Sequence, residues 1–142
     1  MKVNRHACRE YALQTLYAWE TRGKEDGLTL EKELELLNKS FFSCTEEELE
    51  FIRLILDGVA AHEPLLKRTI QTFAPEWPLD KIAAIDRCIL LIGSFELLFN
   101  EDVPDVVAIN EAIELSKSFG DDTSPKFING VLHAALQDKI KK

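Results

Sequence analysis

The sequence lacks the features that mark a membrane protein, a secreted protein or a disulfide-stabilised one. No aliphatic run is longer than four residues, as at Ile89–Ile92, whereas a membrane-spanning helix needs about 20 apolar residues. The first six residues contain no apolar segment of the kind that a secretory signal carries. The three cysteines, Cys8, Cys44 and Cys88, are odd in number and far apart, which favours reduced thiols over a disulfide framework or a zinc site. We therefore expect a soluble, cytoplasmic protein.

Glycine and proline are scarce, with six and five in 142 residues, and no stretch alternates apolar and polar side chains as a half-buried strand does. Apolar residues instead recur every three to four positions, which is the spacing of an amphipathic helix. The length is that of one domain. The sequence therefore predicts an all-α fold of about seven helices. Their approximate ranges are 4–21, 28–42, 45–59, 64–73, 79–99, 105–116 and 124–135.

Short motifs predict several helix starts. Thr45 and Glu48 form a capping box, in which the hydroxyl accepts a backbone N–H and the carboxylate returns the bond. Asp105 is a candidate cap of the sixth helix, and Ser124 followed by Pro125 is a candidate start of the last.

Residues 79–99 are apolar almost all round, so this range is predicted to be the central buried helix. Gly58, Gly93 and Gly130 lie inside helical patterns, where glycine costs about 1 kcal/mol relative to alanine. Close approach of a neighbouring helix is the expected reason, and a functional need for bare backbone is the alternative.

Positive charge is in short supply. Seventeen basic residues against 25 acidic ones give a net charge of −8, which argues against a protein that coats nucleic acid generally. The charge is also unevenly distributed. Residues 1–9 hold three bases and no acid, residues 24–63 hold eleven acids and four bases, and residues 126–142 hold four lysines and one acid. The two basic ends indicate either a small, directed anion site or ordinary solvated termini.

Motifs for catalysis are missing as well. The sequence contains no glycine-rich phosphate loop, no nucleophile elbow and no paired-histidine zinc motif. His6, His62 and His133 have no second histidine at helical spacing, and the acidic run Glu46–Glu50 lacks the alternating oxygens and glycine of a calcium loop. We expect no enzymatic activity, no metal and no cofactor.

A candidate binding face remains at the start of the first helix. Arg5 and Arg9 are four positions apart, so both guanidinium groups project from one face, with His6 beside them and Tyr17 two turns further on. Arginine binds phosphate through two parallel hydrogen bonds, and a tyrosine ring can stack on a base. Taken alone, these residues fit either an RNA site or ordinary salt bridging on a helix surface.

Five segments in order carry a wider resemblance. They are RHACREYALQTLY over residues 5–17, WPLDKIAAIDRCIL over 77–90, FEL over 95–97, PDVVAINEA over 104–112 and KSFGDDTSPKFINGVL over 117–132. Together they resemble the NusB family of transcription antitermination factors. The resemblance covers nearly the whole chain and is weakest between about residues 24 and 45.

This resemblance implies one domain over residues 1–142, built of an N-terminal helical subdomain (about 1–75) and a C-terminal one (about 76–142), without catalysis. It implies a heterodimer with the ribosomal protein NusE that recognises boxA-type single-stranded RNA. Such a heterodimer would act in the transcription elongation complex, notably on ribosomal RNA operons.

The resemblance also implies roles for individual residues. RNA contacts are expected at Arg5, His6, Arg9, Gln14, Tyr17, Lys126 and Phe127, and partner contacts at Asp86, Arg87 and Glu96. The chain departs from the family pattern at three positions. His6 stands where the family usually has arginine, which removes a charge at neutral pH, Cys8 stands in place of alanine, and Leu91 stands in place of arginine.

The leading hypothesis is thus an RNA-binding factor that works as a heterodimer. A second is a helical protein-interaction scaffold, or a homodimer, without significant RNA binding, as the net charge of −8 favours. A third, the NusB-like domain of an RNA methyltransferase, is disfavoured because no catalytic domain follows Lys142. RNA sequence preference and the oligomeric state of the free protein stay open at this stage.

Overall fold

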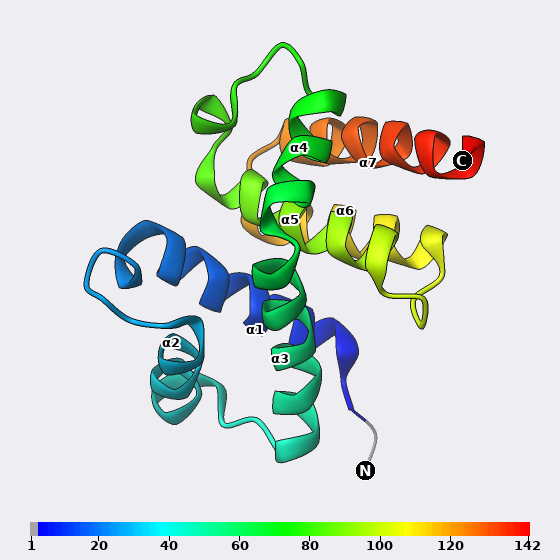
Figure 1. The fold of residues 1–142 in the computed structure, drawn as a ribbon. Helices are drawn as coiled ribbons and strands as arrows, with labels where there is room; N and C mark the ends of the chain where they lie inside the picture. Colours follow the sequence, from blue (N-terminus) through cyan, green and yellow to red (C-terminus); the bar gives the residue numbers. More distant parts are fainter. Residues whose placement is uncertain (1–2) are drawn as a thin grey trace. The chain divides into compact units, whose positions relative to one another are not determined.

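The computed structural model describes residues 3–142, and seven α-helices make up most of this part of the chain (Figure 1). The helices are α1 (Arg5–Ala18), α2 (Leu30–Leu37), α3 (Glu46–Ala61), α4 (Glu63–Phe73), α5 (Ala84–Phe99), α6 (Asp105–Phe119) and α7 (Ser124–Lys141). Two π-helical turns, η1 (Trp19–Gly23) and η2 (Asn38–Phe42), extend α1 and α2, and the 3₁₀ turn η3 (Leu79–Lys81) precedes α5. The predicted all-α fold class is confirmed. No helix within residues 3–142 combines the length and apolarity that crossing a membrane requires.

The chain divides into two compact units, of which the first ends at Asp57 and the second begins at Gly58. The boundary therefore lies inside α3, earlier than the boundary near residue 75 that we expected between subdomains. The reason is the packing of α4, which lies against α5 and α7 and so belongs to the second unit.

In the first unit, the helix starts are stabilised by side-chain caps. Asn4 Oδ1 accepts a hydrogen bond from the Ala7 N–H at 3.0 Å. The predicted capping box is confirmed, since the Glu48 N–H donates to Thr45 Oγ1 at 3.2 Å and the Thr45 N–H donates to Glu48 Oε1 at 3.0 Å. The core of this unit consists of large aliphatic side chains, among them Leu13, Leu16, Leu34, Ile52 and Ile55.

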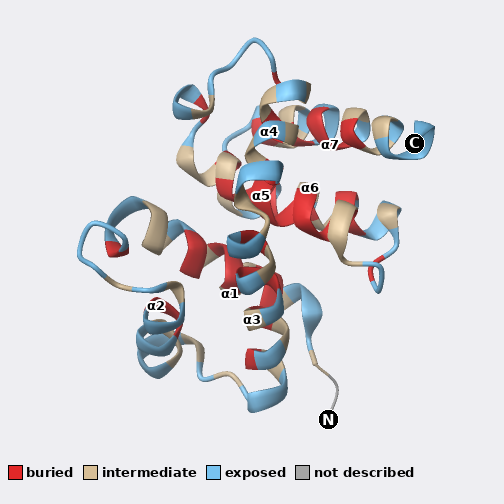
Figure 2. Cartoon of the chain, in the orientation of Figure 1, coloured by how far each residue is buried: buried red, intermediate tan, exposed pale blue. Residues whose placement is uncertain are grey.

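In the second unit, α5 is the central helix. Every residue from Cys88 to Leu97 is buried, and α4, α6 and α7 pack around this helix (Figure 2). The predicted start of α5 at Leu79 is wrong, because the backbone is extended at Ile82 and helix geometry begins only at Ala84. Arg87 Nη1 stabilises the turn that precedes α5 by donating to the carbonyls of Leu79 (3.1 Å) and Ile82 (3.2 Å).

Two other predicted caps are also wrong. Asp105 is the first residue of α6 and does not cap it; its carboxylate instead accepts a hydrogen bond from Lys139 Nζ at 2.6 Å. Ser124 is likewise inside α7. The carboxylate that meets the free amides there is Asp121, whose Oδ1 accepts from the N–H groups of Thr123 (2.8 Å) and Ser124 (3.1 Å). Hydrogen bonds from Thr123, chiefly from its hydroxyl, lower the pKa of Asp121.

The three helical glycines have different structural reasons. A Cβ atom at Gly58 would overlap the ring of Phe95, and one at Gly93 would lie 3.1 Å from the Ala112 Cβ. Close approach is therefore confirmed for these two positions. A Cβ atom at Gly130 would meet no atom within 4 Å, so packing within the chain does not explain that glycine.

Alanine substitutions should separate these cases. We expect Gly130→Ala to raise the free energy of unfolding by about 0.5–1 kcal/mol, because alanine favours the helix and has room. Gly58→Ala should lower it by about 1–3 kcal/mol, because Phe95 must move. Urea unfolding followed by circular dichroism measures both, and equal effects of the two substitutions would contradict this explanation.

Candidate nucleic-acid interface

Arg5 and Arg9 lie over the same aromatic ring. Their Cζ atoms are 5.2 and 5.4 Å from the ring centroid of Phe51 on α3, so the prediction that both project from one face of α1 is confirmed. The two side chains differ in accessibility, because Arg5 is exposed whereas Arg9 is only 3% exposed. Arg5 is thus the arginine of this pair that a ligand can reach. Lys2, counted among the N-terminal bases, lies outside the described residues.

A second stripe of α1 carries the other predicted contacts. His6 is exposed, and its Nε2 lies 3.9 Å from Glu10 Oε2. Gln14 is half-buried, with its Nε2 donating to the Glu10 carbonyl at 3.3 Å, and Tyr17 is 40% exposed. From His6 to Tyr17 the stripe is about 16 Å long at 1.5 Å per residue. This stripe also contains an acidic residue, Glu10, which contacts two of the candidate RNA-binding residues, His6 and Gln14.

Cys8 packs beneath this surface and is not part of it. The side chain is fully buried, and its thiol donates to the Glu48 carbonyl at 3.8 Å. Burial, with a smaller contribution from the Glu48 charge, raises the pKa of Cys8 to about 11. The departure from the family pattern at Cys8 therefore changes packing, whereas the departure at His6 changes the exposed surface.

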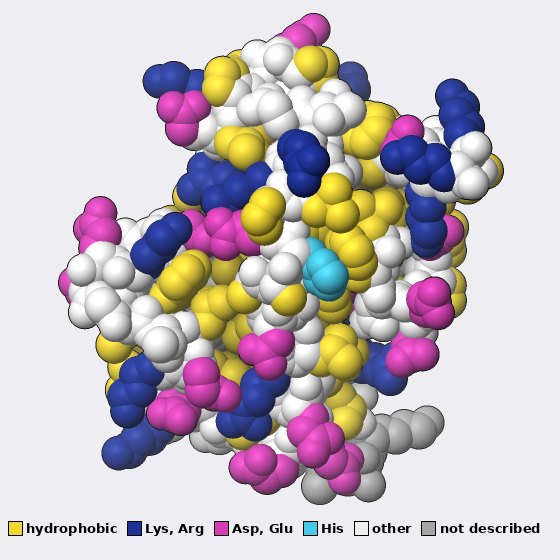
Figure 3. Space-filling model, viewed as in Figure 1, with side chains coloured by type: hydrophobic (Ala, Val, Ile, Leu, Met, Phe, Trp, Pro, Cys, Tyr) yellow, Lys and Arg dark blue, Asp and Glu magenta, His cyan; other side chains and the backbone are white. Residues whose placement is uncertain are grey.

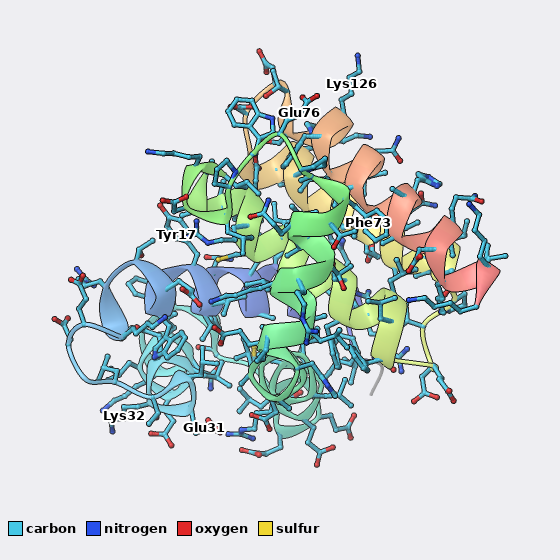
Figure 4. All side chains as sticks on the ribbon, turned by 45° about the horizontal axis from the view of Figure 1, so that its top comes forward. Tyr17, Glu31, Lys32, Phe73, Glu76 and Lys126 are labelled. Atoms are coloured by element: carbon cyan, nitrogen blue, oxygen red, sulfur yellow. The ribbon has the colours of Figure 1, made fainter. Side chains whose placement is uncertain are left out.

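The other two predicted RNA contacts lie in the second unit, at the start of α7. Lys126 is exposed and extends away from α7, at the same end of this unit as Glu76 (Figure 4). Phe127 is half-buried and lines two hollows, of about 280 and 300 Å³, that also share Trp77 as a wall. Trp77 is 53% exposed. The two aromatic rings thus share both hollows, and Lys126 directly precedes one of them in the chain.

Asp86 lines the first of these hollows, together with Phe127, Trp77 and Lys81. It is only 8% exposed, and in the described structure its Oδ1 has no hydrogen-bond partner. Burial raises the pKa of Asp86, against a hydrogen bond from Ser124 that lowers it. The structure thus brings a residue predicted to bind the partner and one predicted to bind RNA to the same hollow.

The remaining partner candidates have other surroundings. Arg87 is half-buried and its guanidinium is engaged with the turn before α5. Glu96 is 1% exposed and therefore lies in the core of the second unit, away from any surface on which a partner docks. Leu91 is also 1% exposed, so the family's arginine position corresponds here to a core leucine.

Elsewhere, charged side chains of both signs are interspersed over the face shown in Figure 3. Several pair within a helix, as Lys67 does with Glu63 (2.5 Å) and Lys117 does with Glu114 (3.6 Å). Arg5 forms no ion pair with any residue from 3 to 142. Within the same residues, no group of three His, Cys, Asp or Glu side chains lies close enough to hold a metal ion.

Reasoning from the sequence missed two aromatic residues of these surfaces. Trp77 carried a signal, because Pro75 and Pro78 bracket it in a stiff, exposed link. Phe51 carried none, since it lies 42 residues or more from either arginine along the chain and its role depends on how α3 packs on α1.

Comparisons with known proteins agree with this architecture. The model of the NusB family matches residues 6–137. The transcription antitermination protein NusB of Dehalococcoides mccartyi is 40% identical over 145 residues, covering 100% of this chain and 98% of that protein. The structure of T. maritima NusB has a TM-score of 0.85 at 28% identity and covers 100% of both chains. The structure of antitermination factors NusB and NusE in complex with dsRNA has a TM-score of 0.83, covers 94% of this chain and 96% of that one, and at 22% identity shows likeness of fold.

The raised pKa of Asp86 predicts a pH-dependent effect of Asp86→Asn. Below about pH 4 the carboxyl is protonated in both the folded and the unfolded chain; as the pH rises, the unfolded chain ionises first, so the native protein loses stability until the pH passes the raised pKa. The variant avoids this loss. Its free energy of unfolding, relative to the native protein, should therefore rise from pH 3.5 to pH 7.

Urea unfolding at a series of pH values provides the measurement. Asp122→Asn is the matched control, since Asp122 is an exposed carboxylate of the same unit and the effect of burial does not apply to it. A stability difference for Asp86→Asn that stays constant with pH would contradict the role of burial.

Proposed function

This chain belongs to the NusB family, and on that basis we propose that it is an RNA-binding transcription antitermination factor. It pairs with the ribosomal protein NusE and recognises boxA-type single-stranded RNA of nascent transcripts, notably those of ribosomal RNA operons. It acts by binding, without catalysis, on the elongation complex in the cytoplasm. The observation that carries the proposal is 40% identity over the full chain to a transcription antitermination protein.

The start of α1 supports the RNA-binding part of this proposal. Arg5 offers an exposed guanidinium, and the exposed imidazole of His6 follows it in the chain. A guanidinium binds phosphate through two parallel hydrogen bonds and also stacks on bases. Arg9, being buried, contributes its charge to the local field but not a surface contact.

The start of α7 supports it in a second way. Single-stranded RNA exposes both phosphates and unstacked bases, and proteins recognise it by placing cations next to aromatic rings. Phe127 and Trp77 line the same hollows, Lys81 lines one of them, and the exposed Lys126 precedes Phe127 in the chain. The hollows that these two rings share are open to a flat, partly apolar group such as a base.

Pairing with NusE is supported by charge and by Asp86. A net charge of −8 opposes the approach of RNA, and a basic partner offsets this repulsion. Asp86 lines the hollow that Trp77 and Phe127 share, and this hollow offers a partner side chain a place to dock. The exposed cations of the two candidate surfaces number few, so RNA affinity should depend on cations that the partner adds.

A thermodynamic cycle tests the proposed function. A labelled boxA-type RNA is titrated into the protein alone and into its complex with NusE, and NusE is titrated with and without RNA, at two salt concentrations. We expect NusE to strengthen RNA binding and RNA to strengthen NusE binding by the same factor, because linkage is reciprocal. Failure to bind RNA in both states, with NusE binding retained, would support the protein-interaction scaffold instead.

Substitution of Arg5 gives a sharper prediction. Arg5→Ala should weaken RNA binding by about 10-fold at 0.1 M salt, because a charged hydrogen-bond donor to phosphate is lost. The slope of log K against log salt should become shallower by about 0.7, the value for one phosphate of a single strand. Fluorescence anisotropy measures both quantities.

Arg22→Ala is the matched control, since Arg22 is an exposed arginine at the other end of the same helical segment, in η1. It should leave affinity and slope nearly unchanged. Equal losses for the two arginines would indicate an unspecific charge effect and contradict a defined contact at Arg5.

A further inference from the structure

The ring of Phe51 lies beneath two guanidinium groups, those of Arg5 and Arg9. The Cζ atoms of Arg5 and Arg9 lie 5.2 and 5.4 Å from its centroid, within the ~6 Å over which a ring face attracts a guanidinium. The ring is half-buried on α3, a helix that also carries Arg53. Neither the chain's motifs nor the family resemblance assigns a role to Phe51.

The contrast with Arg53 shows what an aromatic contact preserves. Arg53 Nε lies 2.5 Å from Glu31 Oε1, so its charge is neutralised and one donor is occupied. Arg5 instead rests on a ring that carries no charge and accepts no strong hydrogen bond. Its positive charge and its N–H donors therefore remain available to a ligand.

The ring also restrains Arg5. A free arginine side chain samples many rotamers, and binding has to offset the loss of that freedom. A guanidinium that is already held over a ring loses less rotamer freedom when it binds a ligand. Arg9, only 3% exposed, is fixed by its burial and so does not need the ring to order it for a ligand.

We infer that Phe51 is a positioning residue of the RNA-binding surface: it holds the exposed Arg5 guanidinium, still charged and with free donors, where a phosphate of single-stranded RNA meets it. The inference rests on the proposed function. It assigns Phe51 no contact with RNA, since the ring acts through Arg5.

Binding measurements with five variants test this role. Phe51→Leu keeps apolar volume but removes the ring face, and it should weaken binding of a boxA-type RNA by about 2- to 5-fold. The salt slope should stay unchanged, because Arg5 still reaches the phosphate. Phe51→Tyr keeps the ring face and should therefore bind RNA as tightly as the native protein.

A double variant and a control complete the test. In an Arg5→Ala background, Phe51→Leu should have no further effect on RNA affinity. Phe42→Leu is the matched control, since Phe42 stacks on Tyr11 at 4.4 Å in the same unit, and it should leave RNA affinity unchanged.

A measurement on the free protein separates this inference from the proposed function. Side-chain ¹⁵N relaxation should show that the Arg5 guanidinium is more ordered than that of Arg22, and that Phe51→Leu removes the difference. Equal mobility of Arg5 in the native protein and in Phe51→Leu overturns the inference. If the native protein binds RNA and Arg5→Ala weakens binding, but Phe51→Leu does not, the inference fails and the proposed function stands. If the protein binds no RNA with or without NusE, both fail.

Discussion

The burial of α5 on every side is the constraint on which the second unit depends. Every residue from Cys88 to Leu97 is buried beneath α4, α6 and α7, and each large aliphatic side chain among them contributes about 1.5–3 kcal/mol when buried fully. A helix enclosed in this way can present functional groups only near its ends. Asp86, in the first turn of α5, reaches a hollow at the surface, whereas Glu96, ten residues on, is enclosed in the core.

Both candidate surfaces combine cations with aromatic rings. In the first unit Arg5 lies over Phe51, and in the second Lys126 precedes Phe127, which shares two hollows with Trp77. On a chain of net charge −8, several cations pair with acids, as Arg53, Lys67 and Lys139 do. The Phe51 ring attracts the Arg5 guanidinium without cancelling its charge. This arrangement suits single-stranded RNA, whose bases and phosphates are both accessible, and it holds within each unit separately.

The departures from the family pattern differ in their consequences because they differ in burial. Cys8 and Leu91 are core residues, so they affect how the helices pack. His6 is exposed, with its Nε2 3.9 Å from Glu10 Oε2, so this departure changes the surface of α1. The departure at His6 therefore changes an exposed position of α1, whereas the departure at Cys8 changes a buried one.

The sequence by itself determined the features that depend on residues within a few turns of each other. Helical periodicity predicted the all-α class and the burial of α5, and the spacing of Thr45 and Glu48 predicted the capping box, since both groups lie in one helical turn. The same local reasoning placed Arg5 and Arg9 on one face. This reasoning failed at Asp105, because its carboxylate accepts a hydrogen bond from Lys139 instead of capping α6. It failed at Ser124, because Asp121 accepts the hydrogen bonds from the free amides at the start of α7.

Only the tertiary structure decided which of these residues a ligand can reach. Helix α3 covers Arg9 and supplies Phe51 to Arg5, and the link before α5 brings Trp77 to the hollows that Phe127 lines. The packing of α4 against α5 and α7 also decided that α4 belongs to the second unit, and the chain divides inside α3. These contacts join residues that are 40 or more positions apart, and no periodicity specifies them. They follow from how the apolar faces of the helices pack, which is a property of the whole unit and not of any one segment.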